Sequence, residues 1–325
     1  MLPSVLVASA GLIGVLQGGH PRDTLRIYAV GDINLGRNLA KTFLAQGDTL
    51  YPFRALADTL RGADLTFGNL ESPIAAETHT VETAGVVFTA PRLAAVALAR
   101  AGFTIVSTAN NHAWDGGRAS AEETMRRLSA AGVRFVGSGF GRPMAEQPVI
   151  LRRKGWRVAF FAVTRAWNPA PTGFYRHAGA GYVAWGDPAW IFPAIRALKA
   201  SGRADLVIVS VHGGKEYVDH PPPYLLSFLQ GLVDAGADLV LAHHPHVLQR
   251  VIRYKGVPIV QSLGNFIFSQ DKPWTQLSAV LRIRVAPDRS MRLSALPVRA
   301  GYQAVLATGP AADSVARRLG VPITH

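Results

Sequence analysis

Three histidines directly follow one apolar run of the chain. Residues 238–242 read Asp-Leu-Val-Leu-Ala, and His243, His244 and His246 come next. The apolar run predicts a buried strand, and a turn after such a strand can aim several side chains at one point. Neutral imidazole is the most common protein ligand for transition metals. The cluster therefore indicates a metal site, although a solvated histidine turn could have the same sequence.

Ligand-type side chains follow four other apolar runs as well. They are Asp32 after 25–30, Glu71 after 63–68, Asn111 with His112 after 103–109, and His212 after 205–211. In an open α/β sheet the carboxyl ends of neighbouring strands meet at one crevice, where ligands bind. Each residue alone could cap a turn or lie in the core, but five strand ends of this kind favour one shared site. Two carboxylates, an amide oxygen and several imidazoles suit Mn, Fe or Zn better than Mg or Ca.

Strands and helices alternate along the chain and would position these residues. Helices are predicted over 50–61, 92–101, 119–131, 188–201 and 223–235, further strands over 133–136, 147–152, 157–163 and 257–262, and hairpin strands within 277–306. This order predicts one α/β domain over residues 24–305, with both sheet faces covered, and a C-terminal tail over 306–325. The segment 165–187 is rich in proline, glycine and aromatic residues, which is typical of a functional loop.

Composition limits the partners and the chemistry. The 325 residues carry a net charge of +13, which suits an acidic polymer, a phosphorylated small substrate or an anionic membrane surface. The arginines are scattered and no nucleic-acid-binding motif occurs, so we expect no nucleic acid partner. The chain has no cysteine, which excludes disulfides and thiolate catalysis and leaves a metal to His, carboxylate and amide ligands.

The first residues have the pattern of an export signal. Residues 2–16 are apolar or small, a length typical of a signal peptide and short for a membrane span. We therefore expect residues 1–22 to be a leader and the protein to be exported. A single membrane anchor and a cytoplasmic location remain the alternatives.

Six motifs, taken in order, resemble one known family. They are Gly31-Asp32, 68–73 (Gly-Asn-Leu-Glu-Ser-Pro), 109–117 (Ala-Asn-Asn-His-Ala-Trp-Asp-Gly-Gly), 212–217 (His-Gly-Gly-Lys-Glu-Tyr), 242–247 (Ala-His-His-Pro-His-Val) and Gly264-Asn265-Phe266. Together they look like the bacterial CapA capsule synthesis family, the poly-γ-glutamate biosynthesis proteins of the calcineurin-like metallophosphoesterase superfamily, over about residues 25–270. The resemblance implies a four-layer α/β/β/α sandwich with two divalent metal ions, in a protein that could work in a membrane-associated capsule synthesis complex.

The resemblance also implies roles for individual residues. The metal ligands would be Asp32, Glu71, Asn111, His212, His244 and His246, with His243 behind them. His112 would be the catalytic histidine, and Asp115 would orient its imidazole. As a separate hypothesis, Lys215 and Arg165 would neutralise an anionic substrate, with an ordinary surface charge as the alternative for each. Asn34 and Asn265 would contact the substrate, and the loop 165–187 would cover it.

This chain departs from the superfamily pattern at three positions. Asn34 stands where an Asp-x-His motif has its histidine, and Glu71 replaces the bridging aspartate. One of the two metals is therefore expected to bind weakly or to bind only with substrate. Gly213 replaces a tryptophan common in relatives, so we expect an opening beside His212.

Three classes of function remain open at this point. The first is a hydrolase of phosphoester or amide bonds, in which two ions would activate a water and His112 would protonate the leaving oxygen. The second is a non-catalytic capsule assembly factor that binds an acidic polymer. The third is a metal-dependent peptide epimerase.

Overall fold

The computed structural model describes residues 22–44, 46–75, 88–168, 182–270 and 272–324. The expected leader lies almost wholly outside these ranges, as does most of the loop 165–187. Within them, no helix has the length and apolar character needed to cross a membrane.

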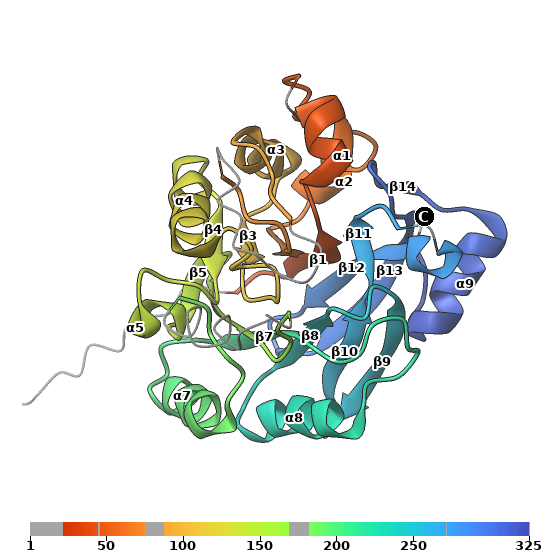
Figure 1. Ribbon diagram of the computed structural model, residues 1–325. Helices are drawn as coiled ribbons and strands as arrows, with labels where there is room; N and C mark the ends of the chain where they lie inside the picture. The colour runs from red at the N-terminus through yellow and green to blue at the C-terminus, as the bar shows by residue number, and fades with distance from the viewer. Residues whose placement is uncertain (1–21, 45, 76–87, 169–181, 271, 325) are drawn as a thin grey trace, which may run out of the picture.

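Two sheets make up the centre of the described structure (Figure 1). The first has eight strands in the order β14-β13-β12-β1-β2-β3-β4, with β11 paired to β1. Its strands are β1 (Leu25–Ile33), β2 (Leu65–Leu70), β3 (Ile105–Ser107), β4 (Arg134–Val136), β11 (Asn265–Ile267), β12 (Leu277–Val285), β13 (Met291–Arg299) and β14 (Val305–Leu306). The pairs from β1 to β4 are parallel, so these strands direct their carboxyl ends to one edge.

The second sheet has six strands in the order β5-β6-β7-β8-β10-β9. They are β5 (Val149–Arg153), β6 (Trp156–Thr164), β7 (Leu206–His212), β8 (Leu239–His243), β9 (Leu248–Tyr254) and β10 (Val257–Leu263). The pairs β6–β7, β7–β8 and β8–β10 are parallel. The sequence did not predict β9, an edge strand whose Arg250 and Arg253 interrupt the apolar pattern.

Helices cover the outer face of each sheet, which confirms the expected α/β/β/α sandwich. One layer contains α1 (Arg37–Leu39), α2 (Ala57–Arg61), α3 (Leu93–Ala101) and α4 (Gly117–Ala130), above the first sheet in Figure 1. The other contains α7 (Pro188–Ala200) and α8 (Pro223–Asp234), below the second sheet. Short helical segments complete the description: Ala40–Leu44, Tyr51–Phe53, α5 (Arg142–Ala145) and Pro273–Gln276. The helix predicted over 50–61 is thus two short pieces.

Three apolar clusters hold the four layers together. The cluster between the sheets joins Phe67 of β2 to Phe160 of β6, whose rings stack with centroids 5.8 Å apart. A second cluster fixes α2 and α3 to the first sheet, and a third fixes α7 and α8 to the other. Burial of this much apolar surface is the main favourable term in folding.

The C-terminal segment packs on the domain instead of leaving it as a tail. Residues Gly309–Leu319 form α9, whose Val315 and Leu319 are fully buried. They pack with Leu248, Ala279 and Ala295 of three strands from the two sheets. The boundary expected at residue 305 therefore does not separate α9 from the sandwich.

A candidate metal centre between the two sheets

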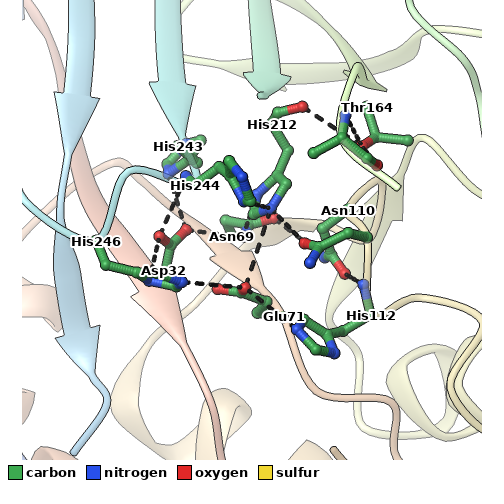
Figure 2. Close-up of polar contacts among 12 residues, drawn as sticks. Asp32, Asn69, Glu71, Asn110, His112, Thr164, His212, His243, His244 and His246 are labelled. Carbon is green, nitrogen blue, oxygen red and sulfur yellow. Dashed lines mark hydrogen bonds and ion pairs between the residues drawn. The ribbon is translucent and has the colours of Figure 1, made fainter. Parts of the chain in front are cut away.

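The predicted ligand residues converge where the carboxyl ends of the two sets of parallel strands meet (Figure 2). The first sheet contributes Asp32 from β1, Glu71 just after β2 and Asn111 after β3, and the second contributes His212 from β7 and the histidines after β8. The sequence predicted that these residues meet at the crevice of one open sheet. The structure instead divides the group between two sheets, and each supplies a different chemistry: the first mainly oxygen, the second nitrogen.

Asp32 is fixed by its neighbours in the sheet. Its backbone N–H donates to Gly264 O at 2.8 Å, and a Cβ at Gly31 would lie only 1.9 Å from that oxygen, so the preceding residue must be glycine. Asp32 pairs in register with Asn69 on β2, and Asn69 Nδ2 donates to Asp32 Oδ1 at 2.8 Å. Burial by itself would raise the pKa of Asp32, but His243, His246 and Asn69 outweigh it and lower the pKa, so the carboxylate stays ionised.

Glu71 is fully buried close to three histidines of the site. Both of its carboxyl oxygens lack a hydrogen-bond partner among the described residues. Oε1 lies 3.9 Å from His212 Nε2, 3.8 Å from His246 Nε2 and 4.0 Å from His112 Nε2. Burial, followed by the charges of Asp32, Glu216 and Asp115, raises its pKa well above the usual value. An ionised carboxylate buried without a partner costs several kcal/mol, so this site calls for a cation.

The imidazoles of His212 and His244 are held neutral, the form that binds metals. Burial and the neighbouring histidines lower the pKa of His212 well below its usual value, and burial with His246 lowers the pKa of His244 to about 3. His212 Nε2 lies 2.7 Å from Asn111 Oδ1 and 3.1 Å from His244 Nδ1. The proton of a neutral His212 can lie on Nε2 and be donated to Asn111 Oδ1, or lie on Nδ1 and leave Nε2 able to bind a metal. Ligand atoms around an ion with bonds of about 2.1 Å lie roughly 3–4 Å apart, so the 3.1 Å between the two imidazole nitrogens fits a shared divalent ion, whereas 2.7 Å is a hydrogen-bond distance.

The donor set therefore fits metal ions. Asp32, Glu71 and His246 offer ligand atoms that all lie within 4.8 Å of one another. His243 is fully buried, and its Nδ1 lies 3.5 Å from Asp32 Oδ1, behind that carboxylate. This placement suits a residue that supports the Asp32 carboxylate, not one that binds the metal itself.

Backbone strain marks the histidine turn. His244 has a φ of 100° and His246 a φ of 57°, both in the left-handed region that side chains other than glycine rarely adopt. Such strain persists where the surroundings fix it, and it is concentrated at functional sites. His246 is fixed further by Asn265, whose Oδ1 lies 2.9 Å from His246 Nδ1.

His112 and Asp115 form the pair expected from the sequence. Asp115 Oδ2 lies 2.7 Å from His112 Nδ1 and also accepts the backbone N–H of Phe88 at 2.6 Å. A proton held at Nδ1 by Asp115 leaves Nε2, on the Glu71 side, as the nitrogen that can exchange protons with a substrate. The Phe88 ring stacks on the imidazole with centroids 3.9 Å apart and limits its rotation.

Two asparagines that the sequence analysis overlooked support the site. Asn69 Nδ2 lies 3.2 Å from His212 Nδ1, in addition to its bond to Asp32. Asn110 donates to Leu70 O and accepts the backbone N–H of His112 at 3.1 Å. Asn69 could have been found from its i, i+2 spacing to Glu71, because alternate residues of a strand point to one side.

A cleft of about 540 Å³ opens beside the ligand group. It is lined by Asn34, Gly36, Arg37, Asn38, Phe88, His112, Glu216, Tyr217, His246, Phe268, Ser269, Gln270, Lys272 and Tyr302. Asn34, which was expected to contact the substrate, therefore lines the cleft. Its Oδ1 accepts the backbone N–H of Gly36 at 2.9 Å. His112 and His246 connect the cleft to the ligand group.

Three of the expected substrate contacts lie elsewhere. Arg165 Nη1 donates to Gly186 O, and its guanidinium lies 4.5 Å from the Phe228 ring centroid, outside the cleft. Lys215 is exposed and does not line the cleft. Asn265 is fully buried beneath His246. The cations that do line the cleft are Arg37 and Lys272, which no motif had indicated.

The expected opening beside His212 is closed. A Cβ at Gly213 would lie 3.2 Å from the Cβ of Arg165 and 3.6 Å from Leu225. Arg165 therefore fills the space that the missing side chain leaves, and its backbone N–H donates to His212 O at 2.7 Å.

Comparison with known proteins identifies the relatives of this chain. The family described as "Bacterial capsule synthesis protein PGA_cap" matches residues 26–270. "Capsule biosynthesis protein CapA" of Bacillus anthracis is 31% identical over 281 residues, covering 85% of this chain and 67% of that protein. "PGA biosynthesis protein CapA" of Bacillus subtilis is 28% identical over 279 residues, covering 85% and 72%.

A solved structure has the same fold at low identity. The 5'-nucleotidase precursor of Thermus thermophilus superposes with a TM-score of 0.50 and 16% identity, over 90% of this chain and 58% of that one. This likeness confirms a metallophosphoesterase-like fold.

Proposed function

This chain belongs to the bacterial capsule synthesis protein family, and from that premise we propose that it is a metal-dependent hydrolase of capsule or polyglutamate synthesis or processing. It would cleave a phosphoester or amide bond, using two divalent ions held between the sheets. The main support is Glu71, a fully buried carboxylate with no hydrogen-bond partner among the described residues and with imidazole nitrogens on several sides.

The ligands would be those named from the sequence. Asp32, Glu71, Asn111, His212, His244 and His246 provide carboxylate, amide and imidazole donors, a set that suits Mn, Fe or Zn. Glu71 lies between the groups from the two sheets and would be one of the residues that hold the metal. When bound, such ions lower the pKa of a water and stabilise negative charge on the atom under attack.

The chain's own residues would do the remaining work. His112 borders the cleft and would hold, at Nε2, the proton that the leaving oxygen of a phosphoester or the leaving nitrogen of an amide takes up. Asp115 keeps the imidazole in the required tautomer, and Phe88 keeps its orientation. Asn265 Oδ1 would accept the Nδ1 proton of His246 and so leave its Nε2 free to bind a metal.

One observation favours a role in polymer binding as a second candidate. The net charge of +13 and the cations of the cleft suit an acidic polymer, so the chain could hold such a polymer during assembly without cleaving it. In both candidate roles the protein would work outside the cytoplasm, as its capsule-synthesis relatives suggest, in contact with an anionic chain.

Replacement of His246 by alanine tests the proposal. We expect His246→Ala to lose bound metal and to lose more than about 100-fold in p-nitrophenyl phosphate hydrolysis with added Mn²⁺. His220→Ala, at an exposed histidine outside this cleft, is the matched control and should change neither quantity. A His246→Ala protein with full metal content and full turnover would contradict the hydrolase proposal. Metal binding without turnover in the native protein would favour the polymer-binding role.

A further inference from the structure

Two cations border the cleft, and each lies over an aromatic ring that also packs on a histidine of the site. The guanidinium of Arg37 lies 5.8 Å from the centroid of Phe88, whose ring stacks on His112. Lys272 Nζ lies 3.5 Å from the centroid of Tyr217, whose ring lies 6.1 Å from that of His246. The cleft is therefore flanked by two cation–aromatic–histidine stacks.

The backbone shows that these positions are constrained. Seven described residues other than glycine have a positive φ, and three of them, Lys154, Lys255 and Arg289, lie in turns between hairpin strands. The other four all belong to the site: Arg37, Tyr217, His244 and His246. A left-handed conformation costs about 1 kcal/mol or more for such residues. Its occurrence in both stacks suggests that the surrounding fold fixes where the two cations stand.

The two cations lack a carboxylate partner. Among the described residues, no aspartate or glutamate pairs with Arg37 or Lys272, whereas most helix-surface arginines, such as Arg118 and Arg127, have one. Glu216 also lines the cleft, but its single negative charge does not balance the two cations, so these three residues together carry a net positive charge. Burial and then Glu216 raise the pKa of Tyr217 to about 12, so its ring stays a neutral platform for Lys272.

We propose that Arg37 and Lys272 bind an anionic group of the substrate that is not part of the bond being cleaved, and so select substrates with more than one negative charge. This inference rests on the proposed function, because it concerns the same cleft. Arg37 can bind an oxyanion through two parallel N–H donors, and Lys272 adds a point charge. The aromatic rings restrict both side chains before the substrate arrives, which lowers the entropy that binding costs.

Carboxylates and phosphates share this oxyanion chemistry, so the test uses one probe of each kind. Binding of tetraglutamate, tetraglutamine and glycerol 3-phosphate is measured by calorimetry at low salt on the metal-free protein. The variants are Arg37→Gln and Lys272→Met, which remove the charge and keep much of the side-chain length. Lys41→Met is the matched control, because Lys41 is exposed on the next helical turn and does not line the cleft.

The expected result is a preference for an anionic probe over tetraglutamine, weakened about tenfold by each of the two variants and unchanged in the control. The anion that binds more tightly identifies the group as carboxylate or phosphate. Equal binding of tetraglutamate and tetraglutamine, undiminished anion binding in both variants, or no anion binding would overturn the proposal. Since metal-free protein is used, this outcome is separate from failure of hydrolysis or metal loading, which the His246→Ala experiment detects.

Discussion

The carboxyl oxygen Oε1 of Glu71 lies 3.8 Å from Nε2 of His246, although the two residues follow strands of different sheets. Glu71 comes after β2 of the first sheet and His246 after β8 of the second. Their approach requires the two sheets to pack at a fixed separation, which the apolar cluster between the sheets provides. The chemistry of the site thus depends on the packing of the sandwich.

Loss of the residue beneath His246 should weaken metal binding. In Asn265→Ala the imidazole loses its 2.9 Å contact to Oδ1, so its Nε2 is no longer held toward Glu71. We expect the affinity for Mn²⁺ or Zn²⁺ to fall about 10- to 100-fold, measured by calorimetric titration. Asn38→Ala, whose side chain donates to Tyr302 on the cleft wall, should leave metal affinity unchanged. An Asn265→Ala protein that binds the metal as tightly as the native chain would show that Asn265 does not position His246 for metal binding.

The Asp115 carboxylate should matter for turnover and not for metal content. Asp115→Asn replaces the acceptor that fixes the Nδ1 proton of His112, and the other tautomer then becomes accessible. We predict a fall in kcat of about 10- to 100-fold with unchanged metal stoichiometry. Turnover at the native level in this variant would exclude proton transfer through an oriented His112.

The ligand residues could be recognised in the sequence because they directly follow apolar runs. Asp32, Glu71, His212 and His246 could all be named in this way, and the structure brings them to one place. Their division between two sheets could not be read from local pattern, because strand pairing joins residues far apart in the chain. Only the family resemblance indicated two sheets.

The substrate side was harder to predict. Lys215 and Arg165 were expected to neutralise an anionic substrate, but neither lines the cleft: Lys215 is exposed, and Arg165 packs on Phe228. Arg37 and Lys272 belong to no recognised motif. Arg37 has a left-handed backbone conformation, and Lys272 directly precedes the short helical segment Pro273–Gln276; hydrophobic periodicity predicts neither feature.

A buried ion pair at the opposite end of β7 makes stability depend on pH. Asp205 accepts hydrogen bonds from the backbone and guanidinium of Arg157 and is paired with Arg22. Burial alone would raise the pKa of Asp205, but the bonds from Arg157 and the charges of Arg157 and Arg22 lower it to about 2. The unfolded chain, with a pKa of about 3.9, therefore takes up this proton first as the pH falls.

The stabilisation by Asp205 should be complete above about pH 4 and lost as the pH falls toward 2. Asp205→Asn should lower the free energy of unfolding at pH 7 by about 1–2 kcal/mol, with a smaller difference at pH 3, measured by urea denaturation. Asp234→Asn, which breaks the exposed pair with Lys255, should have little effect at either pH. A difference for Asp205→Asn that grows with acidity would contradict the assigned direction.

Metal content of the native chain and of Glu71→Gln tests whether the buried Glu71 carboxylate helps to hold divalent ions between the sheets. Both proteins are incubated with Mn²⁺ or Zn²⁺, freed of excess metal and analysed by inductively coupled plasma mass spectrometry. We expect the native chain to keep at least one ion, since the second is expected to bind weakly, and the variant to keep fewer, because glutamine keeps the shape of Glu71 but not the charge between the sheets. A native chain that keeps no divalent ion, or a variant that keeps as many ions as the native chain, would contradict this assignment.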